Sequence, residues 1–425
     1  MLHMKENHTH SDIRPFYFWC ALIFSLLATL IHLYIIQRYS SEFPYRDDYE
    51  AIFCFLTPFL SGHFPDNIPL LFNQNNEHRI FLDNLISLSM VSLTGHFNFY
   101  WMIWIGNIGW FLLAILFWKF SNKNHINFME FSPILIVMMC LSHYELMTMA
   151  MAAVQHYFQV FFCVLSVWYL VSGRRLFALT FFVCAIFTSG GGICLVPVIL
   201  LYYLSKKEWR NLATSVITIG IVFIIYFPLL GYFQPPTHPN VLLALQSPLY
   251  LITYAFGFLG NLGNTYKSSI GLGVIFTMYL ISKWRFLSIR YPFLFWLMAY
   301  LLVTAMTNAI TRGGLGIRTG QGSRYTIYSI IFFFIVYCSF LLSASSAKKR
   351  MYVANMSFVL SLGIFAYWFQ HGQENIAWRY EDLESGVIQH PTPEFAVSTL
   401  KGAADLGYYY PSKTLSPAIE SKADK

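Results

Sequence analysis

Charged residues are scarce in this chain. Only 11% of its 425 residues are Asp, Glu, Lys or Arg, whereas 56% are hydrophobic and 19% are aromatic. A soluble domain carries about 25% charged residues, because its surface must bind water. The apolar residues fall in runs of about 15 to 23, the length that crosses a hydrocarbon layer of about 30 Å. The composition excludes a soluble globular domain and predicts an all-α, polytopic transmembrane helical bundle.

The chain also lacks a disulfide framework and a metal-binding motif. Of its seven cysteines, only Cys54 falls in a predicted loop, and the other six lie inside apolar runs. No spacing typical of a zinc site is present. No small-residue cleavage site follows the first apolar run, so we interpret this run as a retained helix rather than a signal peptide.

The net charge of +7 does not indicate a nucleic-acid partner, because the basic residues are not gathered into one stripe. They form small knots between apolar runs, which is the distribution typical of cytoplasmic loops in membrane proteins. The knots are Lys119 and Lys123, Arg174 and Arg175, Lys206, Lys207 and Arg210, Lys283 and Arg285, and Lys348 to Arg350.

We predict about eleven spans, with the N-terminus in the cytoplasm, the C-terminus outside, and every basic knot on the cytoplasmic side. Residues 80–95 are apolar, but counting them as a span would place the knots outside, and Asp83 and Asn84 interrupt the run. We therefore interpret 80–95 as an interfacial helix within the first outer loop. The predicted spans are 16–36, 97–118, 132–150, 157–172, 176–189, 190–204, 211–233, 266–283, 293–311, 326–344 and 353–370.

Two segments are irregular. Residues 188–192 (TSGGG) break the run 176–204; they predict a tight turn, with close approach of the backbone to a ligand as the alternative. Residues 249–264 predict a second interfacial or re-entrant segment. We divide the chain into a transmembrane domain, 1–370, and a short extracytoplasmic tail, 371–425.

The first outer loop, residues 38–79, carries the adjacent carboxylates Asp47 and Asp48 soon after the first span. One carboxylate of such a pair can act as general base on a sugar hydroxyl or hold a cation, while the other raises its pKa by like-charge repulsion. The alternative is that both are solvated loop acids. A divalent metal could bind the pair, but nothing in the sequence requires one.

The predicted outer loop between 311 and 326 contains three arginines, five glycines and no acid. Outer loops should be poor in Arg, so Arg312, Arg318 and Arg324 need another reason to be there. Bidentate binding of phosphate is one such reason, and the glycines let backbone N–H groups approach the same oxygens. Ion pairs with Asp47, Asp48 or Glu77 and contact with anionic lipid are the alternatives.

Four polar residues flank the outer turn between the third and fourth predicted spans. They are His143, Glu145, Gln155 and His156. Ionisable groups close to membrane depth are candidates for function. A histidine near a helix end is also often a hydrogen-bonded packing residue, so both interpretations stay open.

Together these features resemble the GT-C superfamily of membrane glycosyltransferases, in which an acidic motif follows the first span in a long outer loop with membrane-lying helices. Asp47 and Asp48 occupy that place. The stretch 77–100 (EHRIFLDNLISLSMVSLTGHFNFY) resembles the part of that loop that leads into the second span. Residues 312–325 resemble an outer loop of bacterial GT-C-like proteins of unassigned function, which also carry an Asn-Glu-His-Arg segment. The chain departs from better-known relatives in lacking a large C-terminal outer domain.

The resemblance implies an inverting transfer of a hexose or pentose in the bacterial inner membrane. The donor would be a polyprenyl-phosphate-linked sugar, and the acceptor an extracytoplasmic cell-surface glycan or lipopolysaccharide. Asp47 or Asp48 would be the catalytic base. The donor phosphate would be bound by Arg312, Arg318, Arg324, Tyr325 and Arg79, and the acceptor would be positioned by Glu77, His78, His143, Glu145 and His156.

Two other classes of membrane protein compete with this interpretation. An O-antigen polymerase or ligase also binds lipid-linked phosphate through outer arginines, but usually in a large outer loop, and no loop after residue 79 exceeds about 35 residues. A transporter or lipid flippase should carry charges near the bilayer midplane. The middles of the predicted spans are nearly free of charge.

Overall fold

The structure, a computed structural model, describes residues 13–234, 247–263 and 265–411. Within those ranges the elements of secondary structure are helices, apart from one hairpin of two short antiparallel strands. Seven of the described helices are long and apolar enough to cross a membrane. The chain is therefore an integral membrane protein with an all-α fold.

The seven candidate spans include short 3₁₀ or π-helical segments, labelled η, that continue an α-helix. They are α1 (Ile13–Tyr39), α4 (Phe99–Lys123), α7 with η4 and α8 (Ala150–Ala153, Val154–Phe158 and Gln159–Val171), α11 with η6 (Trp209–Ile224 and Ile225–Leu229), α16 with η7 (Pro292–Arg312 and Gly313–Leu315), η9 with α17 (Ser323–Tyr325 and Thr326–Ser343) and α18 (Ala347–Glu384).

An eighth span results if α14 (Tyr266–Ser282) and α15 (Trp284–Arg290), which are bent by 62° at their junction, are counted as one. The remaining described elements are shorter. They are η1 (Tyr49–Phe53), α2 (Cys54–Ser61), η2 (Ile68–Phe72), β1 (Gln74–Asn75), β2 (His78–Arg79), α3 (Phe81–Thr94), α5 (Phe128–Met138), η3 (Leu141–His143), α6 (Tyr144–Met147), α9 (Arg175–Thr188), η5 (Gly190–Cys194), α10 (Leu195–Lys206), α13 (Pro248–Leu259), η8 (Ile317–Gln321) and α19 (Pro393–Asp405).

The predicted number of about eleven spans is not confirmed. Within the predicted span 132–150, the helix α5 ends at Met138 and two shorter helices, η3 and α6, follow. The segment 176–189 forms the short helix α9, and 190–204 forms η5 and α10. The 14 residues of α9 extend only about 21 Å, less than the thickness of the hydrocarbon layer. An apolar run shows that a segment is shielded from water, by lipid or by protein, but does not show that its helix is continuous.

The two segments interpreted as interfacial also form short helices. The segment 80–95 forms α3, which ends at Gly95 in a left-handed conformation (φ 78°). Most of 249–264 forms α13, which packs against α14 and α16; residue 264 lies outside the described residues. Neither helix is long enough to span, and their position at a membrane interface stays a prediction.

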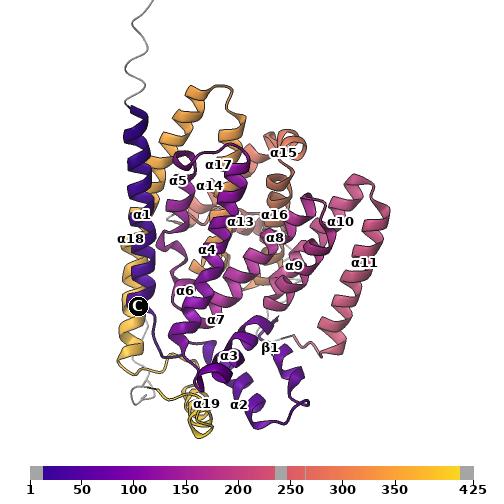
Figure 1. The fold of residues 1–425 in the computed structure, drawn as a ribbon, viewed down its shortest axis with the longest axis vertical. Helices are drawn as coiled ribbons and strands as arrows, with labels where there is room; N and C mark the ends of the chain where they lie inside the picture. The colour runs from indigo at the N-terminus through magenta and orange to yellow at the C-terminus, as the bar shows by residue number, and fades with distance from the viewer. Residues whose placement is uncertain (1–12, 235–246, 264, 412–425) are drawn as a thin grey trace, which may run out of the picture.

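The helix bundle has two different ends (Figure 1). At the upper end in this view lie the start of α1 and the α4–α5, α10–α11 and α17–α18 connections, where the basic knots are found. We call this the basic end. At the lower end lie α2, α3, α19 and the β-hairpin, which we call the loop end.

Contacts between charged residues and neighbouring helices join the elements at the basic end. Arg350, at the start of α18, forms an ion pair with Glu130 near the start of α5. The ammonium group of Lys123, which ends α4, lies 5.9 Å from the ring of Trp168 near the end of α8. Lys123 and Arg350, from two of the basic knots, therefore hold neighbouring helices together at this end.

The C-terminal segment packs on the first loop after α1. Residue 371, where the sequence suggested a boundary, lies within α18, which continues to Glu384. Beyond this helix, the backbone N–H of Arg46 donates to the carbonyl of Gln389 (2.8 Å). Residues 412–425 of the predicted tail lie outside the described residues.

The helices α13 and α14 approach each other almost at backbone contact. A Cβ atom on Gly273 would overlap with the carbonyl group of Phe256, and one on Gly260 would overlap with the carbonyl oxygen of Ser269. Gly271, two residues earlier on α14, has open space where its Cβ would lie.

We predict that Gly273→Ala destabilises the protein by roughly 1–3 kcal/mol, because the added methyl group forces α13 and α14 apart. The matched control Gly271→Ala should be neutral or slightly stabilising, since alanine is favoured over glycine within a helix. Thermal unfolding of the detergent-solubilised variants measures both. Equal midpoints for the two variants would contradict the close approach of these helices.

Candidate functional site

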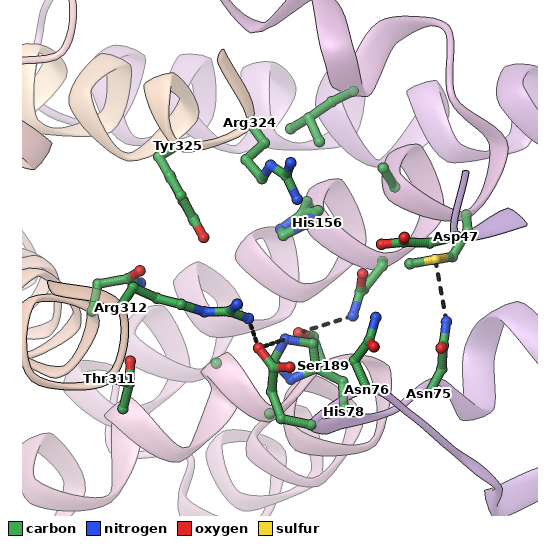
Figure 2. Close-up of a pocket in the computed structure, with 18 of the residues that line it drawn as sticks. Asp47, Asn75, Asn76, His78, His156, Ser189, Thr311, Arg312, Arg324 and Tyr325 are labelled. Carbon is green, nitrogen blue, oxygen red and sulfur yellow. Dashed lines mark hydrogen bonds and ion pairs between the residues drawn. The ribbon is translucent and has the colours of Figure 1, made fainter. Parts of the chain in front are cut away.

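A cavity of about 580 Å³ lies toward the loop end, and segments from many parts of the chain form its wall (Figure 2). They are the loop after α1 (45–47), the tip of the β-hairpin (75–78), the segment from α6 to η4 (145–156), the turn from α9 into η5 (189–194), the end of α16 (304–312) and the start of α17 (324–328). This volume is typical of a site for a small molecule or a lipid headgroup.

Asp47 lines the cavity, and its carboxylate makes no hydrogen bond or ion pair with any described residue. Burial raises the pKa of Asp47, while the nearby guanidinium of Arg324 opposes this rise. Glu50 raises the pKa further, and Arg46 and His390 lower it. Asp47 is thus an uncommitted carboxylate with increased proton affinity, which is the property that a general base requires.

Asp48 does not line the cavity, although it is adjacent to Asp47 in the sequence. Its side chain is 1% exposed, and both oxygens accept hydrogen bonds from backbone N–H groups, Oδ1 from Met151 (2.9 Å) and Oδ2 from Tyr45 (3.1 Å). Burial raises the pKa of Asp48 to about 7. Asp48 therefore fastens the loop after α1 to the start of α7.

Two of the three arginines of segment 312–325 line the cavity together with Tyr325. Arg312 forms an ion pair with Glu77, and Arg324 Nε lies 3.4 Å from Oε2 of Glu145. All four charged groups line the same cavity. A guanidinium carries five N–H donors, so an arginine that pairs with one carboxylate retains donors for a second anion.

The other two arginines predicted to bind phosphate lie elsewhere. Arg318 is exposed on η8 and is not part of the cavity wall. Arg79 is only 2% exposed, and its guanidinium donates to the backbone carbonyls of Phe72 (2.7 Å), Tyr226 (2.9 Å) and Leu230 (3.0 Å). Arg79 thus joins the β-hairpin to the end of α11 and its continuation η6.

The two histidines near α6 have different surroundings. His143 is fully buried, with Nδ1 2.6 Å from the hydroxyl of Tyr157 and Nε2 3.1 Å from the carbonyl oxygen of Met138, and it is outside the cavity wall. His156 lines the cavity and lies close to the Arg324 side chain in Figure 2. The alternative packing role therefore fits the surroundings of His143, and His156 is the site candidate.

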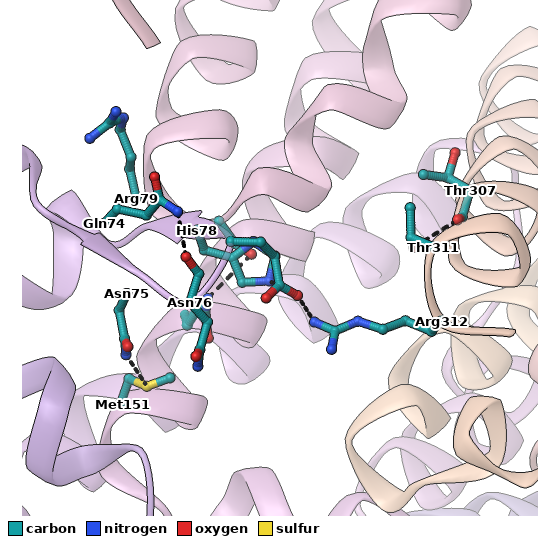
Figure 3. Close-up of polar contacts among 12 residues, drawn as sticks. Gln74, Asn75, Asn76, His78, Arg79, Met151, Thr307, Thr311 and Arg312 are labelled. Carbon is teal, nitrogen blue, oxygen red and sulfur yellow. Dashed lines mark hydrogen bonds and ion pairs between the residues drawn. The ribbon is translucent and has the colours of Figure 1, made fainter. Parts of the chain in front are cut away.

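The β-hairpin places Glu77 and His78 in the cavity wall. Figure 3 shows His78 together with Asn75 and Asn76 of the same hairpin. Its turn is possible because Asn76 adopts a left-handed conformation (φ 49°), which asparagine tolerates. A Cβ on Gly190 would lie 2.8 Å from Nδ1 of His78. The backbone of the predicted turn at 188–192 therefore lies close to the β-hairpin. Glycine at position 190 permits this contact because it has no Cβ.

Sequence reasoning missed a polar face on α16. Its members recur at spacings of three and four residues, which places them on one side of the helix. Such periodic polar residues within an apolar run were a readable signal that the predicted span 293–311 faces a cavity. The face consists of Thr304, Thr307, Asn308, Thr311 and Arg312.

The part of α18 that continues beyond the predicted span contacts the loop that carries Asp47 and Asp48. Arg379 is 5% exposed, and its guanidinium lies 5.1 Å from the ring centroid of Tyr45. It also donates to the hydroxyl of Thr148, between α6 and α7. Sequence reasoning did not single out Arg379, because the sequence gives no indication that α18 continues past the predicted span.

Metal ions in proteins are commonly bound by clusters of His, Cys, Asp or Glu side chains. Within 13–234, 247–263 and 265–411, no group of three or more His, Cys, Asp or Glu side chains converges. A metal at Asp47 and Asp48 stays a prediction; both oxygens of Asp48 accept backbone hydrogen bonds.

Comparison with known proteins found no match to this chain among protein-family models, curated proteins or solved structures.

We predict that Asp48→Asn lowers the thermal stability of the protein, because an amide has only one acceptor oxygen and leaves Tyr45 N–H or Met151 N–H without a partner. The expected cost is about 1–3 kcal/mol. Asp47→Asn should leave stability unchanged or raise it, since the Asp47 carboxylate has no partner to lose. Thermal unfolding in detergent at mildly alkaline pH measures the difference, and an equal loss in both variants would contradict these assignments.

Proposed function

We propose that this protein is a GT-C-like membrane glycosyltransferase that transfers a sugar from a polyprenyl-phosphate donor to an extracytoplasmic acceptor such as a cell-surface glycan. One observation carries the proposal. An unpaired carboxylate, Asp47, and two guanidinium groups, Arg312 and Arg324, line a single cavity in an integral membrane protein. Sugar transfer from a lipid phosphate requires a base and a cationic phosphate site in that arrangement.

The orientation of the protein in the membrane is part of the proposal. Lys and Arg between spans favour the cytoplasmic side, so the basic end faces the cytoplasm. The cavity and residue 411 then lie outside, and α1 begins inside. We place the protein in a bacterial inner membrane, where the donor lipid reaches the cavity from within the bilayer.

The reaction is a single displacement at the anomeric carbon. The carboxylate of Asp47 accepts the proton of an acceptor hydroxyl while that oxygen forms a bond to the anomeric carbon. The bond between this carbon and the phosphate oxygen breaks, and its electron pair leaves with the polyprenyl phosphate. The product has inverted configuration, and its oxygen comes from the acceptor.

The leaving phosphate needs positive charge instead of a proton, because it is already a weak base. Arg312 and Arg324 supply this charge. Glu77 and Glu145 hold the two guanidinium groups in the cavity wall through their ion pairs. Arg79 and Arg318 have no part in this mechanism, since neither lines the cavity.

We predict that Asp47→Asn abolishes sugar transfer while the protein level in the membrane is unchanged, because the amide cannot accept the hydroxyl proton. The control is Asp66→Asn, which changes an exposed aspartate outside the cavity wall. Mass spectrometry of surface glycans compares cells that carry each variant with a deletion strain. The Asp47 variant should match the deletion strain, and unaltered glycans in the deletion strain would refute the proposed function.

The rate of transfer should fall as the pH decreases through the pKa of Asp47, because only the carboxylate form accepts a proton. We call this fall in rate on the acidic side of the pH–rate profile the acid limb. Since burial raises the pKa of Asp47, the acid limb should lie at a higher pH than it would for an aspartate with an ordinary pKa. Arg324 lowers the pKa of Asp47, so Arg324→Gln should move the acid limb of the residual activity upward. The exposed Arg318→Gln is the control, and an equal shift in both variants would contradict the electrostatic effect of Arg324 on Asp47.

A further inference from the structure

The charged residues of the cavity wall are confined to one level. They come from the loop after α1, the hairpin tip, α6, the end of α16 and η9, all toward the loop end. We call them the rim. The rim consists of Arg46, Asp47, Glu77, Glu145, Arg312 and Arg324.

The wall beyond the rim contains neutral polar groups. On α16, Thr304 lies eight residues before Arg312, which places it about 12 Å further from the loop end. Thr307 and Asn308 lie five and four residues before Arg312 on the same helix. Tyr328 lies four residues after Arg324 along η9 and α17, about 6 Å further from the loop end. Gln155 lies in the candidate span that begins at Ala150. We call this set the floor, and it consists of Gln155, Thr304, Thr307, Asn308 and Tyr328.

Hydrogen-bonding capacity remains unused on the floor. The carboxamide of Asn308 has no hydrogen-bond partner among the described residues. The hydroxyl of Thr304 donates to the carbonyl oxygen of Tyr300 (2.8 Å) and keeps its lone pairs as acceptors. The hydroxyl of Tyr328 donates to Oε1 of Gln159 (3.0 Å) and likewise retains acceptor capacity. The floor thus offers both donors and acceptors to a ligand.

We infer that the floor binds an uncharged sugar ring, while Arg312 and Arg324 at the rim bind the phosphate. This inference rests on the proposed function. Sugar hydroxyls donate and accept hydrogen bonds at once, which amide and hydroxyl side chains can match. A carboxylate on the sugar would lose its hydration at the floor without gaining a cation, so acidic sugars are rejected.

Either the donor or the acceptor could supply the ring that the floor binds. Binding to the purified full-length protein in detergent distinguishes them. The probes are decaprenyl phosphate, the same lipid carrying glucose, galactose, arabinose or glucuronic acid, and the methyl glycosides of the neutral sugars. The wild-type protein should bind at least one neutral sugar form more tightly than decaprenyl phosphate and than the glucuronic acid form.

Asn308→Leu should weaken binding of the preferred neutral probe roughly three- to tenfold, as expected for one lost hydrogen bond, and should leave decaprenyl phosphate binding unchanged. Thr307→Val, which keeps the shape of the side chain, should act in the same direction. Thr277→Val is the matched control, since Thr277 is buried on α14 outside the cavity. Arg324→Gln should weaken every lipid phosphate by a similar factor.

If Asn308→Leu and Thr307→Val weaken binding of the lipid-linked sugar alone, the donor is the source of the ring. If they weaken binding of the methyl glycoside alone, the acceptor is the source. Either result supports the inference. Equal binding of decaprenyl phosphate with and without sugar, joined with no binding of glycosides, overturns it and leaves the proposed function standing. Preference for glucuronic acid also overturns it. Absence of binding by every lipid phosphate refutes the proposed function and this inference together.

Discussion

The geometry of the cavity depends on the two hydrogen bonds that the buried carboxylate of Asp48 accepts from the backbone of Tyr45 and Met151. These bonds fix the loop after α1 against the start of α7. Because neighbouring side chains in a turn point in different directions, fastening Asp48 inward leaves Asp47 facing the cavity. Burying a carboxylate costs free energy unless its oxygens accept hydrogen bonds, and here each oxygen of Asp48 accepts one from the backbone.

The opposite wall is assembled in a comparable way. Arg79 uses its guanidinium to hold the β-hairpin against the end of α11, and the hairpin then presents Glu77 to Arg312. Arg379, from the extended α18, stacks on Tyr45 behind the acidic loop. Buried arginines that satisfy backbone carbonyls therefore build the site, and those that line the cavity carry the chemistry that we propose.

Several parts of this arrangement were readable before the fold was known. The segment 312–325 stood out because its arginines oppose the usual charge distribution, and Arg312 and Arg324 do line the cavity. The two aspartates could not be told apart, since adjacent residues of one type carry the same local signal. The polar face of α16 was present in the sequence as a periodic pattern. It was missed because hydroxyl and amide groups within an apolar run give a weaker signal than charged residues.

The sequence by itself determined that the protein is embedded in a membrane and is helical, because long apolar runs and few charged residues are compatible only with a lipid bilayer. It also predicted that the basic knots lie on one side of the membrane. Only the tertiary structure decided which aspartate and which arginines face the cavity, how many helices are long enough to cross, and that the C-terminal segment packs on the first loop. The reason is physical. Hydrophobicity is a property of a local stretch, whereas a cavity is formed where segments hundreds of residues apart pack together.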